Sequence, residues 1–391
     1  MLAACCWIAP DHLQPFQSQQ IQAAANSTID WKVFLQLTSR HRVAAIAAAN
    51  LRRHAPHTLP DEWRTRLSKR ASRIGEQALC QAAELAKIGR VLAAHQIAVL
   101  PLKGPLLSLN LFGQLGLRDV RDIDILIEPA EVWRTDEILH HSGYRRTSPD
   151  VVFTPRIRAA ALQVVHHFAY VHEATGTLLE LHWRLTHWHP AQIQQLWHIS
   201  EQRNWMSVSF HHLPPGPLLA VLCDHGAHHH WSSVKWLGDV ATLISQIPAG
   251  AWEAVIRCVR ELDVEVPVAQ AALLCESFLS IPIPDSLQHL IQREKAVPRL
   301  AAIAVKVMLC DEPGRIFSEN PIARLPALVL NLFVYRSRLR KRFPASTAWS
   351  QINVCLDDCR DTPLPDRLFF LYTLLRPLFW LRRRLKIAAS G

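Results

Sequence analysis

Apolar residues return every three or four positions in two long stretches near the N-terminus. These stretches are VFLQLTSRHRVAAIAAANLRRH at 33–54 and SRIGEQALCQAAELAKIGRVLAAH at 72–95. Both are rich in Ala, Leu, Arg and Gln, and this spacing predicts amphipathic helices. Pro56 and Pro60 separate the two runs. We therefore expect residues 1–95 to form an N-terminal helical region.

Beyond residue 95 the apolar segments become shorter and alternate in type. IAVLPL at 97–102 predicts a buried strand that ends at Gly104, and PLLSLNLF at 105–112 predicts a short helix with Pro in its first turn. DIDILI at 122–127 predicts a second strand. PAEVWRTDEILHHSG at 129–143 predicts a helix that Gly143 ends.

Two alternating runs follow, VVHHFAYVHE at 164–173 and TLLELHWRL at 177–185. The intervening ATG predicts an antiparallel hairpin. An order of strand, helix, strand, helix and hairpin predicts a small mixed α/β core at 96–190.

Helical patterns return over 191–391, which we expect to form a C-terminal helical region with a basic tail. The clearest patterns are 215–231, 235–247, 251–262 and 266–280. No period of 20 to 50 residues recurs in the sequence, so a solenoid is not expected.

The net charge of +10 is concentrated near the C-terminus. Residues 331–391 carry twelve Lys and Arg against four Asp, which leaves about +2 for the other 330 residues. The basic clusters are RSRLRKRF at 336–343 and RRRLK at 382–386. They suit an acidic partner, either nucleic acid or a membrane surface; a solvated helix face is the alternative.

Nine cysteines show no repeated spacing, which favours a reduced, cytoplasmic protein. The N-terminus does not read as a signal peptide. The most apolar segment, 368–381, is interrupted by Arg376 and Pro377 and is shorter than the ~20 residues of a spanning helix. We therefore expect no transmembrane segment.

The strand DIDILI carries two carboxylates on one face. Side chains alternate along a strand, so Asp122 and Asp124 point to one side and the Ile residues to the other, core side. Two like charges about 7 Å apart repel each other, and a divalent cation removes this cost. Oxygen ligands suit Mg²⁺, which also binds substrate phosphates. The alternative is that both Asp residues face solvent on an edge strand.

A third carboxylate follows in TLLELHWRL, where Glu180 shares a strand face with His182. If this strand pairs beside DIDILI, three carboxylates converge, as in two-metal phosphoryl transfer. The alternative is an exposed strand glutamate.

Two further constellations carry weaker signals. In LPLKGPLL, Lys103 and Gly104 lead from a strand into a helix N-terminus, which suits an anion, although the Walker pattern is missing. His225 and His229 have the spacing of a zinc-binding helix, but Gly226 replaces the Glu of HExxH. Helix packing, or the lining of an acceptor pocket, is the alternative to a metal site there.

The run LPLKGPLLSLNLFGQLGLRDVRDIDILIEP, with the later LLELHWRL, resembles the uncharacterised nucleotidyltransferases of the DNA polymerase β-like superfamily. Gly104 stands at the strand-to-helix turn, Asp122 and Asp124 match the paired acids, and Glu180 stands where a third acid is expected. The landmarks in DHGAHHHWSSVKWLGDVATLI at 224–244 are also similar. The resemblance implies an α+β fold, with a small mixed-sheet core flanked by helical regions.

The resemblance also implies an activity and roles for residues. The protein would move a nucleoside monophosphate from a nucleoside triphosphate, such as ATP, to a hydroxyl on a small molecule, peptide or protein. Asp122, Asp124 and Glu180 would be catalytic and would bind Mg²⁺ or Mn²⁺. The nucleotide would be bound by Lys103, Gly104 and Arg118. His182 would support Glu180; the alternative for His182 is a histidine that only packs within the strand.

Two departures from the superfamily pattern bear on activity. Pro105 follows Gly104 and removes one backbone donor, and the third acid is Glu where Asp is usual. The alternative function is therefore a degenerate accessory protein that binds nucleotide or nucleic acid without turnover.

Overall fold

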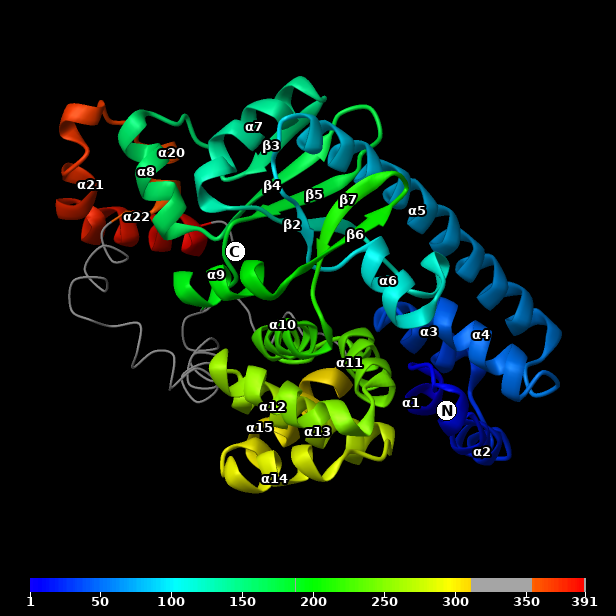
Figure 1. The fold of residues 1–391 in the computed structure, drawn as a ribbon. Helices are drawn as coiled ribbons and strands as arrows, with labels where there is room; N and C mark the ends of the chain where they lie inside the picture. Colours follow the sequence, from blue (N-terminus) through cyan, green and yellow to red (C-terminus); the bar gives the residue numbers. More distant parts are fainter. Residues whose placement is uncertain (187, 311–353, 390–391) are drawn as a thin grey trace.

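The computed structural model describes residues 1–186, 188–310 and 354–389, with side chains described as far as Arg382 (Figure 1). The basic cluster at 336–343 lies outside these residues, and of the cluster at 382–386 only the first side chain is described. Within the described ranges, no helix combines the length and the apolar character needed to cross a bilayer. All nine cysteines fall in these ranges and none is in a disulfide.

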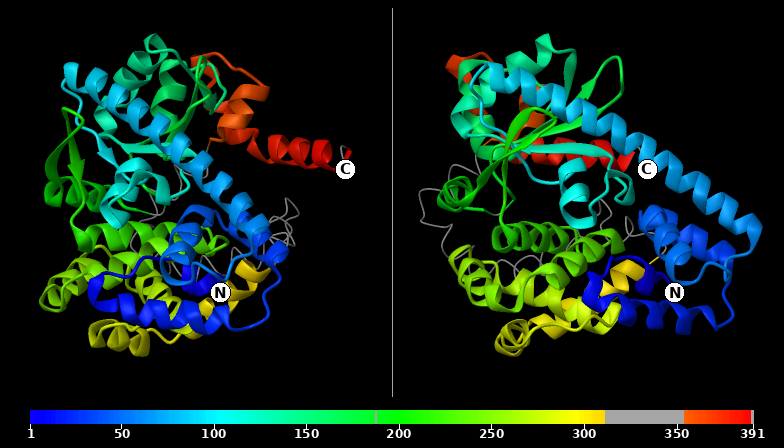
Figure 2. Two further views of the ribbon diagram at one scale, coloured as in Figure 1. Left: turned by 90° about the vertical axis from the view of Figure 1, so that its right-hand side faces the viewer. Right: turned by 45° about the vertical axis from the view of Figure 1, so that its right-hand side comes forward.

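The N-terminal region is helical, as predicted. Its helices are α1 (Leu2–Cys5), α2 (Gln14–Ala25), α3 (Trp31–Arg40), α4 (Ala44–His54) and α5 (Asp61–Ala94), with a 3-10 turn η1 (Asp11–Leu13). Helix α4 ends just before Pro56, and α5 begins directly after Pro60, because proline lacks the amide donor that a helix interior needs. Helix α5 extends over 34 residues and runs along the molecule (Figures 1 and 2).

A five-stranded mixed sheet forms the centre of the molecule. Its strands are β1 (Leu100–Pro101), β2 (Asp122–Leu126), β3 (Tyr144–Ser148), β4 (His167–His172) and β5 (Leu178–His182). The spatial order is β1-β2-β5-β4-β3; β2 and β5 are parallel and the other pairs are antiparallel. The predicted hairpin is the β4–β5 pair. Strand β2 lies in the interior of the sheet, so the edge-strand alternative for its carboxylates is wrong.

The connections follow the predicted turn chemistry. Helix α6 (Pro105–Phe112) has the predicted bounds and ends at Gly113, which adopts a left-handed conformation. The segment after β2 forms a 3-10 turn η3 (Pro129–Glu131) and helix α7 (Val132–His141). Gly143 then adopts a φ of 87°, a conformation that glycine tolerates best. The short strand β3 and helix α8 (Pro155–Val164) were not predicted.

Helices cover both faces of the sheet. Ile123, Ile125 and Ile127 of the β2 segment are buried in a core with residues of α5, α7 and α8, as the alternation predicts. Leu126 points to the opposite side and joins a second core that includes α10 (Pro215–His228). Figure 1 shows α7 on one side of the sheet and α10 on the other. Asp122 and Asp124 share the face of Leu126 and therefore lie on the side of the sheet on which α10 packs.

Helices dominate the remainder of the described chain. They are α9 (Pro190–Ile199), α10, α11 (Val234–Gln246), α12 (Trp252–Glu261), α13 (Glu265–Leu279), α14 (Asp285–Arg293), α15 (Val297–Leu309), α20 (Leu356–Asp361), α21 (Leu371–Leu374) and α22 (Arg376–Ala389), with 3-10 turns η2 (Leu115–Leu117), η4 (Ala249–Ala251) and η5 (Asp366–Leu368). The four predicted helical patterns correspond to α10, α11, α12 and α13. The second, small sheet, β6 (Glu201–Trp205) paired with β7 (Val208–His212), was not predicted.

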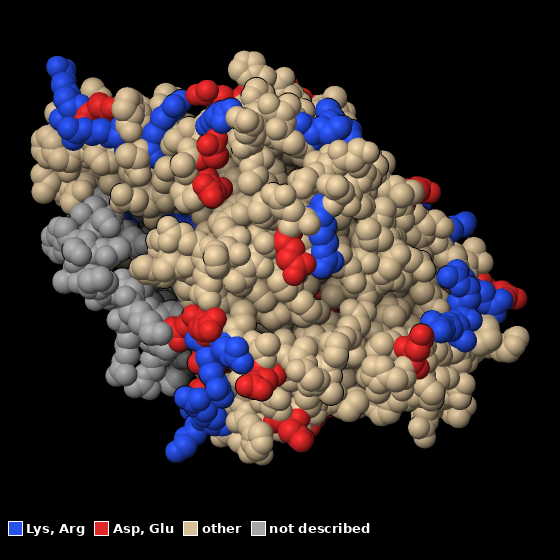
Figure 3. All heavy atoms as spheres, in the orientation of Figure 1, with Lys and Arg blue, Asp and Glu red and all other residues tan. Residues whose placement is uncertain are grey.

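Charged side chains do not form a single-sign patch on the face shown in Figure 3, where basic and acidic groups lie close to one another among uncharged residues.

Candidate active site

The three predicted acidic residues lie on two neighbouring strands. Strands β2 and β5 run parallel, and Asp124 pairs in register with Glu180. Asp122 lies two residues before Asp124 and therefore shares its face. Asp124 is only 1% exposed, whereas Asp122 and Glu180 are half-buried. The pairing on which the convergence of the three carboxylates depended is thus confirmed.

The turn after β1 brings a cation to this acidic face. Nζ of Lys103 lies 2.9 Å from Oδ1 of Asp124, and the backbone N–H of Leu102 donates to the carbonyl oxygen of Asp124 at 3.0 Å. Gly104 adopts a φ of 81° and a ψ of −150°, a region that is essentially restricted to glycine. The Lys-Gly sequence therefore sets both the charge and the backbone path at the start of α6.

The pKa values of the two aspartates on β2 are shifted in opposite directions. Burial and the neighbouring charge of Asp124 raise the pKa of Asp122 above its ordinary value. Burial also disfavours the ionised form of Asp124, but the Lys103 ammonium and His182 hold the pKa of Asp124 well below its usual range. The charge of Asp124 is thus compensated by Lys103, whereas the charge of Asp122 is not fully compensated within the protein.

His182 connects two of the acidic groups. Its Nε2 lies 3.1 Å from Oε2 of Glu180 and 3.4 Å from Oδ1 of Asp124. The hydrogen bond with His182 lowers the pKa of Glu180. Burial by itself would lower the pKa of His182, but the two carboxylates together raise it. His182 therefore contacts Glu180, as a supporting role would require.

The chemistry of the donors at this face suits a divalent cation. Asp122, Asp124 and Glu180 share the face and carry the hard oxygen ligands that Mg²⁺ prefers, but the group of described residues whose ligand atoms all lie within 4.8 Å of one another is His167, Glu180 and His182. The pKa of Asp122 is raised by burial and by the like charge of Asp124, and a bound cation would offset both costs of its ionised form.

Arg118 is not brought to the carboxylates. Its Nε lies 3.0 Å from Oδ2 of Asp239 in α11, and both side chains are almost fully buried. The adjacent Asp119 forms an ion pair with Arg42 at 2.9 Å, and its carbonyl oxygen accepts from Lys235 at 3.1 Å. Arg118 therefore belongs to a buried charge network that anchors the loop leading into β2, rather than to the set of groups that contact Asp124.

A cavity of about 260 Å³ adjoins the acidic face. It lies between the β4–β5 hairpin and α10, and Lys103, Glu180 and His182 contribute to its wall. Five further histidines also line it: His166, His167, His225, His228 and His229. The sequence prediction missed His166 and His167, although alternation with the buried Phe168 and Tyr170 places His167 on the polar face of β4.

His225 of α10 and His229, which directly follows the last residue of α10, line this cavity. Their rings lie 4.6 Å apart, and both contact Trp236. Gly226 between them has a packing role, because a Cβ at this position would lie 2.4 Å from the ring of Trp231. The helix therefore has no room for the catalytic glutamate of a zinc protease at this position.

The mixed sheet, the acidic face and the flanking helices together define a nucleotidyltransferase core. The sequence model of a family described as uncharacterised nucleotidyltransferase matches residues 27–280. The chain belongs to this family, and it is accordingly an enzyme that transfers a phosphorus-containing group from a nucleoside triphosphate. No curated protein matches the sequence significantly.

Proposed function

We propose that this enzyme transfers a nucleoside monophosphate to a hydroxyl group on a small molecule, peptide or protein and releases pyrophosphate. The observation that carries the proposal is the pairing of Asp124 with Glu180 across β2 and β5, with Asp122 on the same face. The ion pair between Lys103 and Asp124 adds a phosphate-binding cation directly beside this face.

The reaction requires one bond to form and one to break. The acceptor oxygen bonds to the α-phosphorus, and the bond from that phosphorus to the oxygen bridging the β-phosphate breaks, so pyrophosphate leaves. The proton of the acceptor hydroxyl passes to the carboxylates, with Glu180 best placed because it also lines the cavity. Asp122, Asp124 and Glu180 would hold Mg²⁺, which stabilises developing negative charge and lowers the pKa of the attacking hydroxyl.

The chain positions the triphosphate with a cation and a helix N-terminus. Lys103 neutralises phosphate charge, and the free amides of the first turn of α6 point toward an anion. Pro105 contributes no amide, so Leu106 and Leu107 supply the donors of that turn.

The cavity beside Glu180 is the acceptor site in this proposal. Burial lowers the pKa of His229 to about 3, and that of His225 well below its ordinary value. Both rings are therefore neutral near pH 7 and present hydrogen-bonding nitrogens without adding positive charge. Such a lining suits an uncharged hydroxyl-bearing acceptor group.

Transfer of label from the four nucleoside triphosphates tests the proposal. ATP, GTP, CTP and UTP labelled at the α-phosphate are incubated with Mg²⁺, the protein and an acceptor library, and mass spectrometry also detects modification of the protein itself. We expect wild type to transfer label and both Asp122→Asn and Asp124→Asn to lose it by at least about 100-fold. Glu128→Gln is the matched control, because Glu128 is exposed and lies two residues beyond the end of the same strand.

Two outcomes would contradict the proposal. Transfer that survives in Asp122→Asn and Asp124→Asn would remove the carboxylates from the chemistry. Nucleotide binding in wild type without turnover on any acceptor would favour the degenerate accessory protein instead.

A further inference from the structure

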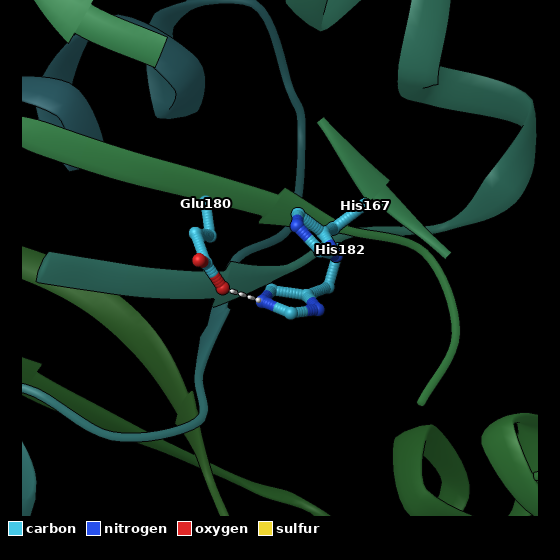
Figure 4. A group of neighbouring side chains, drawn as sticks. All are labelled: His167, Glu180 and His182. Atoms are coloured by element: carbon cyan, nitrogen blue, oxygen red, sulfur yellow. Dashed lines mark hydrogen bonds and ion pairs between the residues drawn. The ribbon is translucent and has the colours of Figure 1, made fainter. Parts of the chain in front are cut away.

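Two histidines stand beside Glu180 in a geometry that resembles a metal site. His167 of β4 pairs in register with His182 of β5, and Glu180 lies two residues before His182. The three side chains therefore project from the same face of the sheet. One ligand atom from each lies within 4.8 Å of the other two (Figure 4).

The contacts around His182 match the spacing of ligands on one ion. Bonds of about 2.1 Å place neighbouring ligand atoms roughly 3.0 Å apart in an octahedral site and roughly 3.4 Å apart in a tetrahedral site. Nε2 of His182 lies 3.1 Å from Oε2 of Glu180 and 3.4 Å from Oδ1 of Asp124. The His182 nitrogen thus lies at a ligand-to-ligand distance from each of two carboxylate oxygens.

The imidazole of His167 is also available and reachable. Its Nδ1 is buried and has no hydrogen-bond partner, an arrangement that costs stability unless a ligand compensates it. His182 is 7% exposed, and its ring centroid lies 4.9 Å from that of His167. All three residues of the group line the cavity, which provides a path for an ion to enter.

Imidazole nitrogen discriminates between cations. Mg²⁺ prefers oxygen ligands, whereas imidazole suits first-row transition ions, with affinities that rise from Mn²⁺ toward Cu²⁺. We infer that His167, Glu180 and His182, together with Asp124, form a mixed nitrogen and oxygen site that takes a divalent transition ion. This inference rests on the proposed function, because it assigns the ion on the Glu180 side of the same active site.

Direct measurement of ion binding, without nucleotide or acceptor, tests the inference. Mn²⁺ titrated into the full-length protein is followed by electron paramagnetic resonance, and Mg²⁺ is then added as a competitor. We expect wild type to bind Mn²⁺ at least about tenfold more tightly than Mg²⁺. His167→Gln should weaken Mn²⁺ binding by about 10- to 100-fold and leave Mg²⁺ affinity unchanged, since losing even a supporting residue costs this much.

His166→Gln is the matched control. His166 lines the same cavity, and its ring lies 4.5 Å from that of His167, but it is not a member of the group. We expect this variant to keep wild-type Mn²⁺ affinity. His167 is only half-buried, so its substitution is tolerated better than that of His182, and circular dichroism checks the fold of each variant.

The outcomes separate this inference from the proposed function. Unchanged Mn²⁺ affinity in His167→Gln, or displacement of Mn²⁺ by equimolar Mg²⁺, overturns the inference and leaves nucleotide transfer intact. Loss of Mn²⁺ binding in His167→Gln supports the inference even if no acceptor is ever modified, because the measurement contains no nucleotide.

Discussion

Nζ of Lys103 lies 2.9 Å from Oδ1 of Asp124, so an ion pair joins the turn after β1 to the acidic strand β2. Lys103 is 15% exposed and Asp124 is 1% exposed, which means that the pair is largely shielded from solvent. We therefore infer two roles for Lys103: it compensates the charge of Asp124, and it contacts phosphate when a nucleotide binds.

Replacing Lys103 tests its role in nucleotide binding. We expect Lys103→Met to weaken nucleoside triphosphate binding by about 10- to 100-fold, because a hydrogen bond to a charged group contributes about 1.5–3 kcal/mol. Equilibrium binding of a labelled nucleotide measures the effect. Lys69→Met is the control, since Lys69 is exposed on α5; equal affinity in both variants would exclude a phosphate role for Lys103.

Substituting each aspartate of β2 by asparagine should change the free energy of unfolding in opposite directions. The pKa of Asp122 is raised in the folded protein, so its ionisation costs stability once the pH exceeds the ordinary value of 3.8. Asp122→Asn should therefore increase the free energy of unfolding at pH 7, and this gain should vanish below pH 3.8. Urea denaturation at pH 7 and below pH 3.8 measures the change in the free energy of unfolding. A loss of stability at pH 7 would contradict the cost of ionising Asp122.

Asp124→Asn should destabilise the protein. The folded-state pKa of Asp124 is lowered, so its ionised form contributes stability above 3.8, and that stability is lost as the pH falls through the lower folded value. The substitution also leaves Lys103 without its partner, which costs about 3 kcal/mol for a buried pair. The same denaturation experiment at pH 7 tests this, with Glu128→Gln expected to remain near wild type.

The buried ion pair between Arg118 and Asp239 should stabilise the folded protein by holding the loop that leads into β2. We expect Asp239→Asn to lower the free energy of unfolding by about 3–5 kcal/mol, because it leaves a buried guanidinium uncompensated. The double variant Arg118→Met with Asp239→Leu should recover most of this loss. A double-mutant cycle in urea that also includes the single variants Arg118→Met and Asp239→Leu measures the coupling, and additive single effects would show that the pair does not act as a unit.

Substitution of Gly226 tests how closely α10 packs against Trp231, and Gly75 in α5 is the control. Gly226→Ala should destabilise the protein by about 1–3 kcal/mol, since the new Cβ would lie 2.4 Å from the Trp231 ring. Gly75→Ala in α5 has no atom within 4 Å of its Cβ, so it should stabilise by about 0.5–1 kcal/mol. Thermal unfolding compares them; a neutral Gly226→Ala would mean that Trp231 moves freely.

Local sequence patterns predicted the elements whose signals are strong. Pro105 at the first turn and Gly113 after the last fixed the bounds of α6, because these residues act on the backbone directly. Strand β3 and the β6–β7 pair escaped prediction. The sequences of β3 and β6, YRRTS and EQRNW, consist mainly of exposed polar residues, so no alternating apolar pattern marks them as strands. In β7, VSFHH, the buried Val208 and Phe210 do alternate, but over only five residues.

For the candidate site too, the sequence predicted some of the residues and missed others. The sequence identified Asp122, Asp124, Glu180 and Lys103, which the fold brings to one face. It assigned Arg118 to the nucleotide, whereas the structure pairs it with Asp239, 121 positions further along the chain. His167 was overlooked because its significance depends on its partner across β4 and β5, and a register between strands cannot be read from one strand.

What the sequence determined by itself is the direction of each side chain within its own element. The two-residue period of a strand places Asp122 and Asp124 together whatever surrounds them. Only the tertiary structure decided that Glu180 and His167 stand beside them and that α10 packs on that side of the sheet. Strand order and helix packing arise from contacts between distant residues, and these are fixed only when the whole chain buries its apolar surface.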